Sequence, residues 1–144
     1  MAKFFFTNGY RSFCLLFEHQ TLFEGNAKSN DEILVFVTAC YGTGEPTDNA
    51  KSFYQYCMSN SLESLNNVKY TIFGLGNSKS FPERYNVISR NLRGKFDSIG
   101  ATRVFEHGEG DSAHCIEKEF EDWKASLVEA IKKDSLNWGG SSSA

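Results

Sequence analysis

Three glycine-containing segments carry the residues best suited to bind a ligand. They read Thr-Ala-Cys-Tyr-Gly-Thr-Gly-Glu-Pro at 38–46, Gly-Leu-Gly-Asn at 74–77 and Glu-His-Gly-Glu-Gly-Asp at 106–111. Glycine lets the backbone approach a ligand closely and exposes its N–H groups. Tyr41 in the first segment, and Phe81 or Tyr85 after the second, offer flat faces for stacking. One Gly-x-Gly alone predicts only a turn, but together these features favour a planar heteroaromatic ligand over a hydrolytic reaction.

The surrounding residues predict alternating strands and helices. Apolar runs at 33–39 and 70–75 are nearly continuous, as in strands buried on both faces of a parallel sheet, and a shorter strand is expected at 103–106. Apolar residues repeat at helical spacing at about 53–57, 85–99 and 116–131. This order predicts an α/β fold, an open parallel sheet with helices on both faces. Because ligands bind where parallel strands end, the glycine segments are expected to meet there.

The composition excludes other classes of protein. The 144 residues, 40% of them apolar and 23% charged, suit one soluble globular domain. Acidic residues outnumber basic ones by 18 to 15, which disfavours general nucleic-acid binding. The longest apolar runs, 13–17 and 33–37, are too short for a membrane span or a secretory signal, so a cytoplasmic location is expected.

Cysteine and histidine spacing does not predict a metal site. The cysteines are spread widely and form no C-x-x-C pair, which indicates reduced thiols. His107, His114 and Cys115 lie close in sequence, but no fourth ligand accompanies them. We expect these three residues to lie on the surface.

The glycine motifs resemble those of a known family. Tyr-Gly-Thr-Gly-Glu-Pro-Thr-Asp-Asn-Ala at 41–50, Phe-Gly-Leu-Gly-Asn at 73–77 and Glu-His-Gly-Glu-Gly-Asp at 106–111 resemble the flavodoxin-like FMN domain of diflavin reductases, with the NADPH-cytochrome P-450 reductase type as the nearest branch. Three ordered motifs are much more specific than one. The resemblance covers about 33–127 and implies a flavodoxin-like sheet and FMN as cofactor.

The resemblance also implies which residues contact the flavin. They are Ala39, Cys40, Tyr41, Gly42, Gly44, Leu75, Gly76, Asn77, Phe81, Tyr85, Asn86, Asp111 and Ser112. The first loop would wrap one edge of the isoalloxazine, with Tyr41 stacked on one face, and the second would bond the pyrimidine edge. Phe81 is favoured as the ring on the other face, with Tyr85 behind it. Asp111 or Ser112 would lie near the ribityl chain.

The N-terminal part departs from the family pattern. It has no S-x-T-G-x-A/T loop to bind the FMN phosphate, and Thr7-Asn8-Gly9 is only a faint echo of one. The first βαβ unit is therefore expected to be shortened, which would weaken FMN binding. We divide the chain into an atypical N-terminal part at 1–32, a flavodoxin-like FMN-binding domain at 33–138 and a flexible tail at 139–144.

By resemblance, the function is electron transfer. FMN would accept electrons from a reduced FAD domain and pass them singly to a haem protein such as a cytochrome, with no side chain acting as acid, base or nucleophile. Without FAD and NADPH modules, the chain is expected not to oxidise NADPH alone. Seven acidic residues between 106 and 122 either steer a basic acceptor or form a solvated helix face.

Two alternatives remain open. The first is a degenerate flavodoxin-like domain that binds no flavin and acts as an interaction module, which the missing phosphate loop supports. The second is the flavodoxin part of another multidomain enzyme, of the nitric oxide synthase, methionine synthase reductase or wybutosine-synthesising type.

Overall fold

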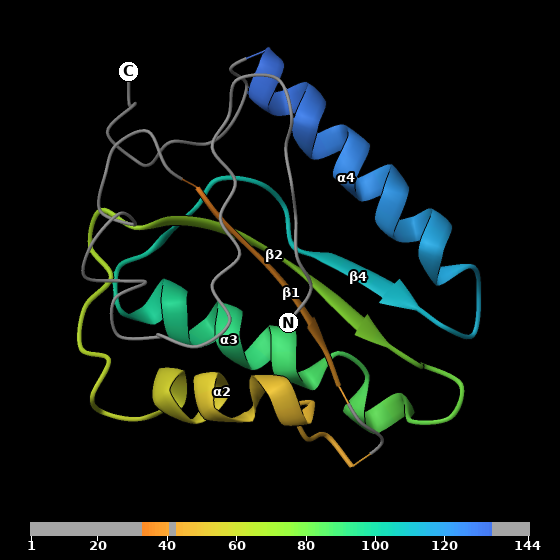
Figure 1. Ribbon diagram of the computed structural model, residues 1–144, viewed down its shortest axis with the longest axis horizontal. Coiled ribbons are helices and arrows are strands. Elements are labelled where there is room, and N and C mark those ends of the chain that lie inside the picture. Colours follow the sequence, from red (N-terminus) through yellow and green to blue (C-terminus); the bar gives the residue numbers. More distant parts are fainter. Residues whose placement is uncertain (1–32, 41–42, 134–144) are drawn as a thin grey trace.

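The computed structural model describes residues 33–40 and 43–133, in which strands and helices alternate (Figure 1). In chain order the elements are β1 (Leu34–Ala39), the 3-10 helix η2 (Asp48–Ala50), α2 (Lys51–Met58), β2 (Lys69–Gly76), the 3-10 helix η3 (Pro82–Arg84), α3 (Val87–Ser98), β3 (Thr102–Arg103), β4 (Gly108–Asp111) and α4 (Ile116–Lys132). The predicted shortened unit at 1–32 and the predicted tail at 139–144 lie outside the described residues.

The strands form one parallel sheet centred on β2. Strand β1 pairs with one edge of β2, in a register that places Leu34 opposite Tyr70 and Ala39 opposite Leu75. Strands β3 and β4 both pair with the other edge of β2. All of these pairings are parallel, and β1, β2 and β4 end at the same side of the sheet, whereas β3 pairs only with the start of β2.

Apolar side chains on both faces of the sheet explain why β1 and β2 are almost continuously apolar. On one face, Phe36 and Tyr70 contact Phe96 of α3, with ring centroids 5.3 and 5.2 Å apart. On the other face, Phe73 contacts Trp123 of α4, with centroids 5.1 Å apart. Figure 1 shows α2 and α3 on one side of the sheet and α4 on the other. The predicted open parallel sheet with helices on both faces is confirmed.

The third strand differs from the prediction. Instead of one strand at 103–106, the chain forms the short β3, leaves the sheet, and pairs again as β4, so the expected third loop is largely strand. Gly108 explains the difference, because a Cβ there would lie 2.3 Å from Cδ2 of Phe73 and 2.6 Å from Cδ1 of Trp123. Glycine is a poor strand former by propensity, but here only glycine leaves room for the two rings.

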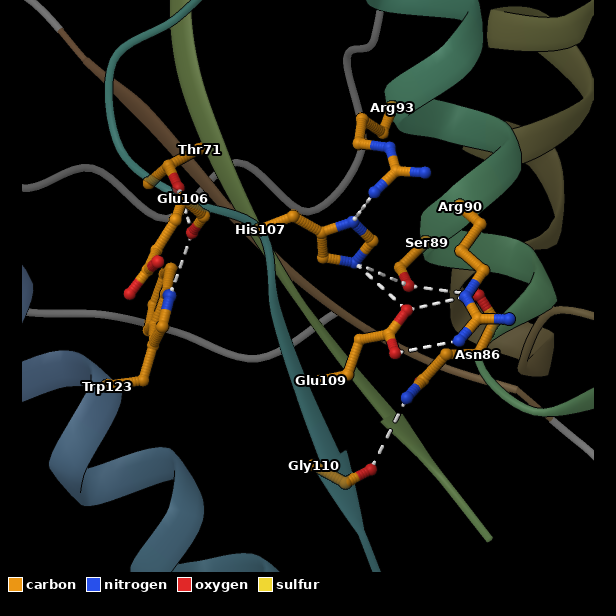
Figure 2. Close-up of polar contacts among 10 residues, drawn as sticks. All are labelled: Thr71, Asn86, Ser89, Arg90, Arg93, Glu106, His107, Glu109, Gly110 and Trp123. Carbon is orange, nitrogen blue, oxygen red and sulfur yellow. Dashed lines mark hydrogen bonds and ion pairs between the residues drawn. The ribbon is translucent and has the colours of Figure 1, made fainter. Parts of the chain in front are cut away.

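Side chains bind the backbone carbonyls in the break between β3 and β4. The Thr71 hydroxyl donates to the carbonyl of Phe105 at 3.1 Å. The indole N–H of Trp123 donates to the carbonyl of Glu106 at 3.0 Å (Figure 2). These bonds satisfy carbonyls that the sheet does not pair. The break is therefore a stable part of the fold.

No helix in the described parts of the chain has the length and apolar character needed to cross a membrane.

Candidate functional site

The ends of β1, β2 and β4 are joined by backbone hydrogen bonds at the carboxyl edge of the sheet. The Cys40 N–H donates to the Leu75 carbonyl at 3.1 Å, and the Ser112 N–H donates to the Gly76 carbonyl at 2.8 Å. The three glycine segments of the sequence therefore meet at one edge, where an open α/β sheet binds its ligands.

The first loop brings Ala39, Cys40 and Gly44 to this edge, whereas Tyr41 and Gly42 lie outside the described residues. Ala39 is half-buried at the end of β1, and the Cys40 thiol lies 3.4 Å from the Arg84 carbonyl in the second loop. Gly44 has a φ of +87°, a conformation that favours glycine. The backbone thus turns tightly beside the second loop.

The second loop folds around Asn77 and presents an aromatic ring to solvent. The side-chain oxygen of Asn77 accepts hydrogen bonds from the N–H groups of Lys79 and Ser80, at 3.1 and 2.8 Å. Phe81 follows with 46% of its surface exposed. Tyr85 is half-buried and has the Arg90 guanidinium 5.4 Å from its ring centroid. Phe81 is therefore the more accessible of the two candidate stacking rings.

Asn86 ends this loop in a buried position beneath β2. Its φ of 53° is left-handed, and α3 begins at the next residue. Its side-chain nitrogen donates to the Gly110 carbonyl at 3.4 Å, while its side-chain oxygen has no partner among the described residues. That oxygen would lie 3.1 Å from a Cβ at Gly76. The Asn86 amide thus occupies the space that a side chain at Gly76 would fill.

Asp111, at the end of β4, fastens the second loop to the sheet. Its carboxylate accepts bonds from the Ser78 hydroxyl, from the Ser78 N–H at 3.0 Å and from the Ala113 N–H at 2.9 Å. The bonds from Ser78 hold the pKa of Asp111 below its usual range. Ser112 is exposed beside it. The Asp111 carboxylate is thus occupied by hydrogen bonds from Ser78 and Ala113.

Replacing Asp111 with alanine is expected to loosen the start of the second loop. Amide exchange at Ser78 and Ala113, measured by NMR, should accelerate about tenfold because both N–H groups lose their acceptor. Asp122→Ala is the matched control, since the Asp122 carboxylate pairs with Lys118 on the exposed surface of α4. Equal exchange rates in the two variants would contradict this role for Asp111.

The side chain of His107 is buried, so the prediction that it lies on the surface is wrong. Only 4% of its side chain is exposed, and it lies between α3 and β4 beside Ser89 and Arg93 (Figure 2). With Arg90, Arg93 and Glu109 it lines an open pocket of about 530 Å³. Burial and the neighbouring Arg93 cation lower the pKa of His107 to about 4. Charged residues lie close to His107 in the sequence, which is typical of an exposed segment, so the sequence did not predict this burial.

His114 and Cys115 are exposed, as predicted. Among residues 33–40 and 43–133, no group of three histidine, cysteine, aspartate or glutamate side chains is placed to hold a metal ion.

The sequence matches the Flavodoxin family over residues 10–123. The chain belongs to the flavodoxin family. The match covers most of the chain and includes all three glycine segments. It begins well before residue 33, where the motif resemblance began, and so also covers residues that the structure does not describe.

Two relatives that match the chain are named as reductases. An NADPH–cytochrome P450 reductase of Dictyostelium discoideum is 38% identical over 106 residues, which are 72% of this chain and 16% of the relative. That of Phanerodontia chrysosporium is 43% identical over 109 residues, 72% of this chain and 14% of the relative. The predicted resemblance to this type of reductase is confirmed. The chain spans about a sixth of the length of these relatives.

Solved flavodoxins share the fold. The C101A mutant of flavodoxin from Pseudomonas aeruginosa superposes with a TM-score of 0.57 at 25% identity, covering 70% of this chain and 67% of that one. Oxidised flavodoxin 1 from Bacillus cereus gives 0.54 at 21% identity, covering 78% of this chain and 70% of that one. The flavodoxin-like fold predicted from the motifs is confirmed.

Proposed function

We propose that the chain is the FMN-binding, electron-transferring part of a flavoprotein of the NADPH–cytochrome P450 reductase type. The observation that carries the proposal is the exposed Phe81 ring beside joined glycine segments at the carboxyl edge of the sheet. A large apolar ring exposed at a ligand-binding edge suits stacking on a planar ligand. The family and the reductase relatives support FMN as that ligand.

The residues present fit a flavin in two respects. Glycine at 44 and 76 lets the second loop pack closely against the strand ends, because Arg84 would lie 3.2 Å from a Cβ at Gly44 and Tyr85 would lie 3.0 Å from one at Gly76. Phe81 and Tyr85 lie on the same loop, and that loop is fastened by Asp111 at one end and by Asn86 at the other. The loop would therefore hold its rings in place before the ligand arrives.

FMN would supply the redox chemistry, taking electrons from a donor and passing them on singly. This chain's residues would orient the ring system and exclude water from one of its faces. We propose NADPH as the source of the electrons and a haem protein as the acceptor, following the names of the relatives, and a reduced FAD domain as the direct donor, following the motif resemblance. The acidic residues Glu117, Glu121 and Asp122 of α4 are exposed and suit a basic acceptor surface.

Titrating the purified chain with FMN tests this proposal. We expect quenching of flavin fluorescence, with FMN bound more tightly than riboflavin if a phosphate site is present. Phe81→Ala should weaken FMN binding about tenfold through lost stacking. Met58→Ala is the matched control, because Met58 is the other exposed large apolar residue of the described parts, at 40%, and lies in α2.

The result also separates the alternatives. Equal, weak binding of FMN and riboflavin would mean that the chain recognises the flavin ring but not the FMN phosphate. No binding of either would overturn the proposal and favour an interaction module. Where FMN binds, electron transfer is tested by reducing the loaded chain and mixing it with cytochrome c as a haem probe. The absence of haem reduction would contradict the electron-transfer role.

A further inference from the structure

Four hydrogen bonds link the surface of α3 to the end of β4, passing through His107 (Figure 2). Nη1 of Arg93 lies 2.9 Å from Nδ1 of His107, and Nε2 of His107 lies 3.1 Å from the Ser89 hydroxyl. The hydroxyl is 3.1 Å from the Asn86 carbonyl. Nδ2 of Asn86 then reaches the Gly110 carbonyl. No earlier step in the functional argument uses Arg93, His107 or Ser89.

The first residue of this series fixes the direction of the others. A guanidinium group has only hydrogen-bond donors, so Nδ1 of His107 must accept from Arg93. The neutral imidazole then carries its proton on Nε2 and donates to the Ser89 hydroxyl. That hydroxyl is left to donate to the Asn86 carbonyl, as its geometry allows. Each group in the series thus has one role.

Burial, together with the cations around it, keeps the imidazole of His107 neutral by lowering its pKa. The cations of Arg90 and Arg93 on α3 and of Arg103 on β3 all disfavour its protonation. Glu109 on β4 lies 3.9 Å from Nε2, but its carboxylate is already bound by Arg90 at 2.6 and 2.8 Å. The low pKa of about 4 agrees with this geometry. The donor and acceptor roles therefore hold at neutral pH.

The series passes through Asn86, the residue that closes the second loop, before it reaches Gly110. Asn86 is held on both sides, by the Ser89 hydroxyl at its carbonyl and by Gly110 at its side-chain nitrogen. Both contacts are buried. The Asn86 carbonyl also accepts from the Arg90 N–H at 3.0 Å. Ser89 therefore adds to the contacts that hold Asn86, which is joined directly to Tyr85 in the loop that carries Phe81.

We propose that Arg93 and His107 are positioning residues of the flavin site, which orient Ser89 and Asn86 and so hold the 77–86 loop against β4. This inference rests on the proposed function. Neither residue needs to touch the flavin. Their effect is on how firmly the stacking loop is held before the ligand binds.

Two substitutions of His107 separate hydrogen bonding from packing. Glutamine can accept from Arg93 with its side-chain oxygen and donate to Ser89 with its nitrogen, as the imidazole does. Leucine fills space but does neither. We expect His107→Leu to weaken FMN binding about tenfold, the effect of about one hydrogen bond, and His107→Gln to restore most of the affinity. Circular dichroism of each variant checks that it is folded.

The tautomer of His107 provides a readout that does not depend on FMN. In the free chain, ¹⁵N NMR should show Nε2 protonated and Nδ1 bare at pH 7. Arg93→Met should convert this state into a mixture of tautomers, and Arg93→Lys, which still donates, should restore it.

The outcomes distinguish the two proposals. If the wild-type chain binds no FMN, the proposed function fails and this inference fails with it. If the wild type binds FMN and a folded His107→Leu variant binds it equally well, only the inference is overturned. A proton on Nδ1 in the wild type would also overturn it, because the direction of the series would then be wrong.

Discussion

Replacing Gly108 with alanine is expected to lower the free energy of unfolding by about 3 kcal/mol, the upper part of the range for an overpacked core. The new Cβ would meet Phe73 at 2.3 Å and Trp123 at 2.6 Å. Trp123 cannot simply move away, because its indole N–H donates to the Glu106 carbonyl. Urea denaturation of both proteins, followed by tryptophan fluorescence, measures the difference.

Gly94→Ala provides the matched control for this substitution. A Cβ at Gly94 would meet no described atom within 4 Å outside its own helix backbone. Gly94 lies inside α3, where alanine is favoured over glycine by about 1 kcal/mol. The control should therefore be more stable than the wild type while the Gly108 variant is less stable. A Gly108 variant as stable as the control would mean that β4 does not pack against Phe73 and Trp123 as described.

Lowering the pH from 7 to 4 is expected to remove about 3 kcal/mol of stability through His107 alone. Burial and Arg93 lower the pKa of His107 from 6.5 to about 4 in the folded chain. Between these values the unfolded chain binds a proton that the folded chain does not, so the free energy of unfolding falls as the pH falls. Above about pH 6.5 the contribution is complete.

His107→Gln isolates this contribution, because glutamine does not titrate. Glu109 and Asp111 also have lowered pKa values, so acid weakens the fold through them in both proteins. The difference in pH dependence between wild type and variant should remain about 3 kcal/mol over this range. Parallel curves for the two proteins, from urea denaturation at each pH, would contradict the buried neutral state of His107.

The parts of the fold that the sequence predicts well are those where one pattern determines one structure. Strands β1 and β2 are apolar on both faces, and α4 places Trp123 and Leu127 at helical spacing, so their patterns are unambiguous. Strand β4 was missed because its glycines look like a loop. Their lack of side chains matters only once Phe73 and Trp123 are packed over them, which is a tertiary effect.

The candidate site was likewise predictable only in part from the sequence. The meeting of the glycine segments follows from strand order and was predicted. The burial of His107 was not, because its partners Arg93 and Ser89 lie 14 and 18 residues away on a helix. Its neighbours Glu106 and Glu109 are charged and suggest exposure. The FMN contacts inferred from the family motifs remain predictions for the titrations above.

The break between β3 and β4 also bears on how the molecule meets other copies of itself. The described edge of the sheet beyond β2 consists of a two-residue strand and a four-residue strand, not one long ladder. Between them, the carbonyls of Phe105 and Glu106 are already bound by Thr71 and Trp123. A strand from another molecule would find only short stretches to pair with here, a feature that discourages edge-to-edge aggregation.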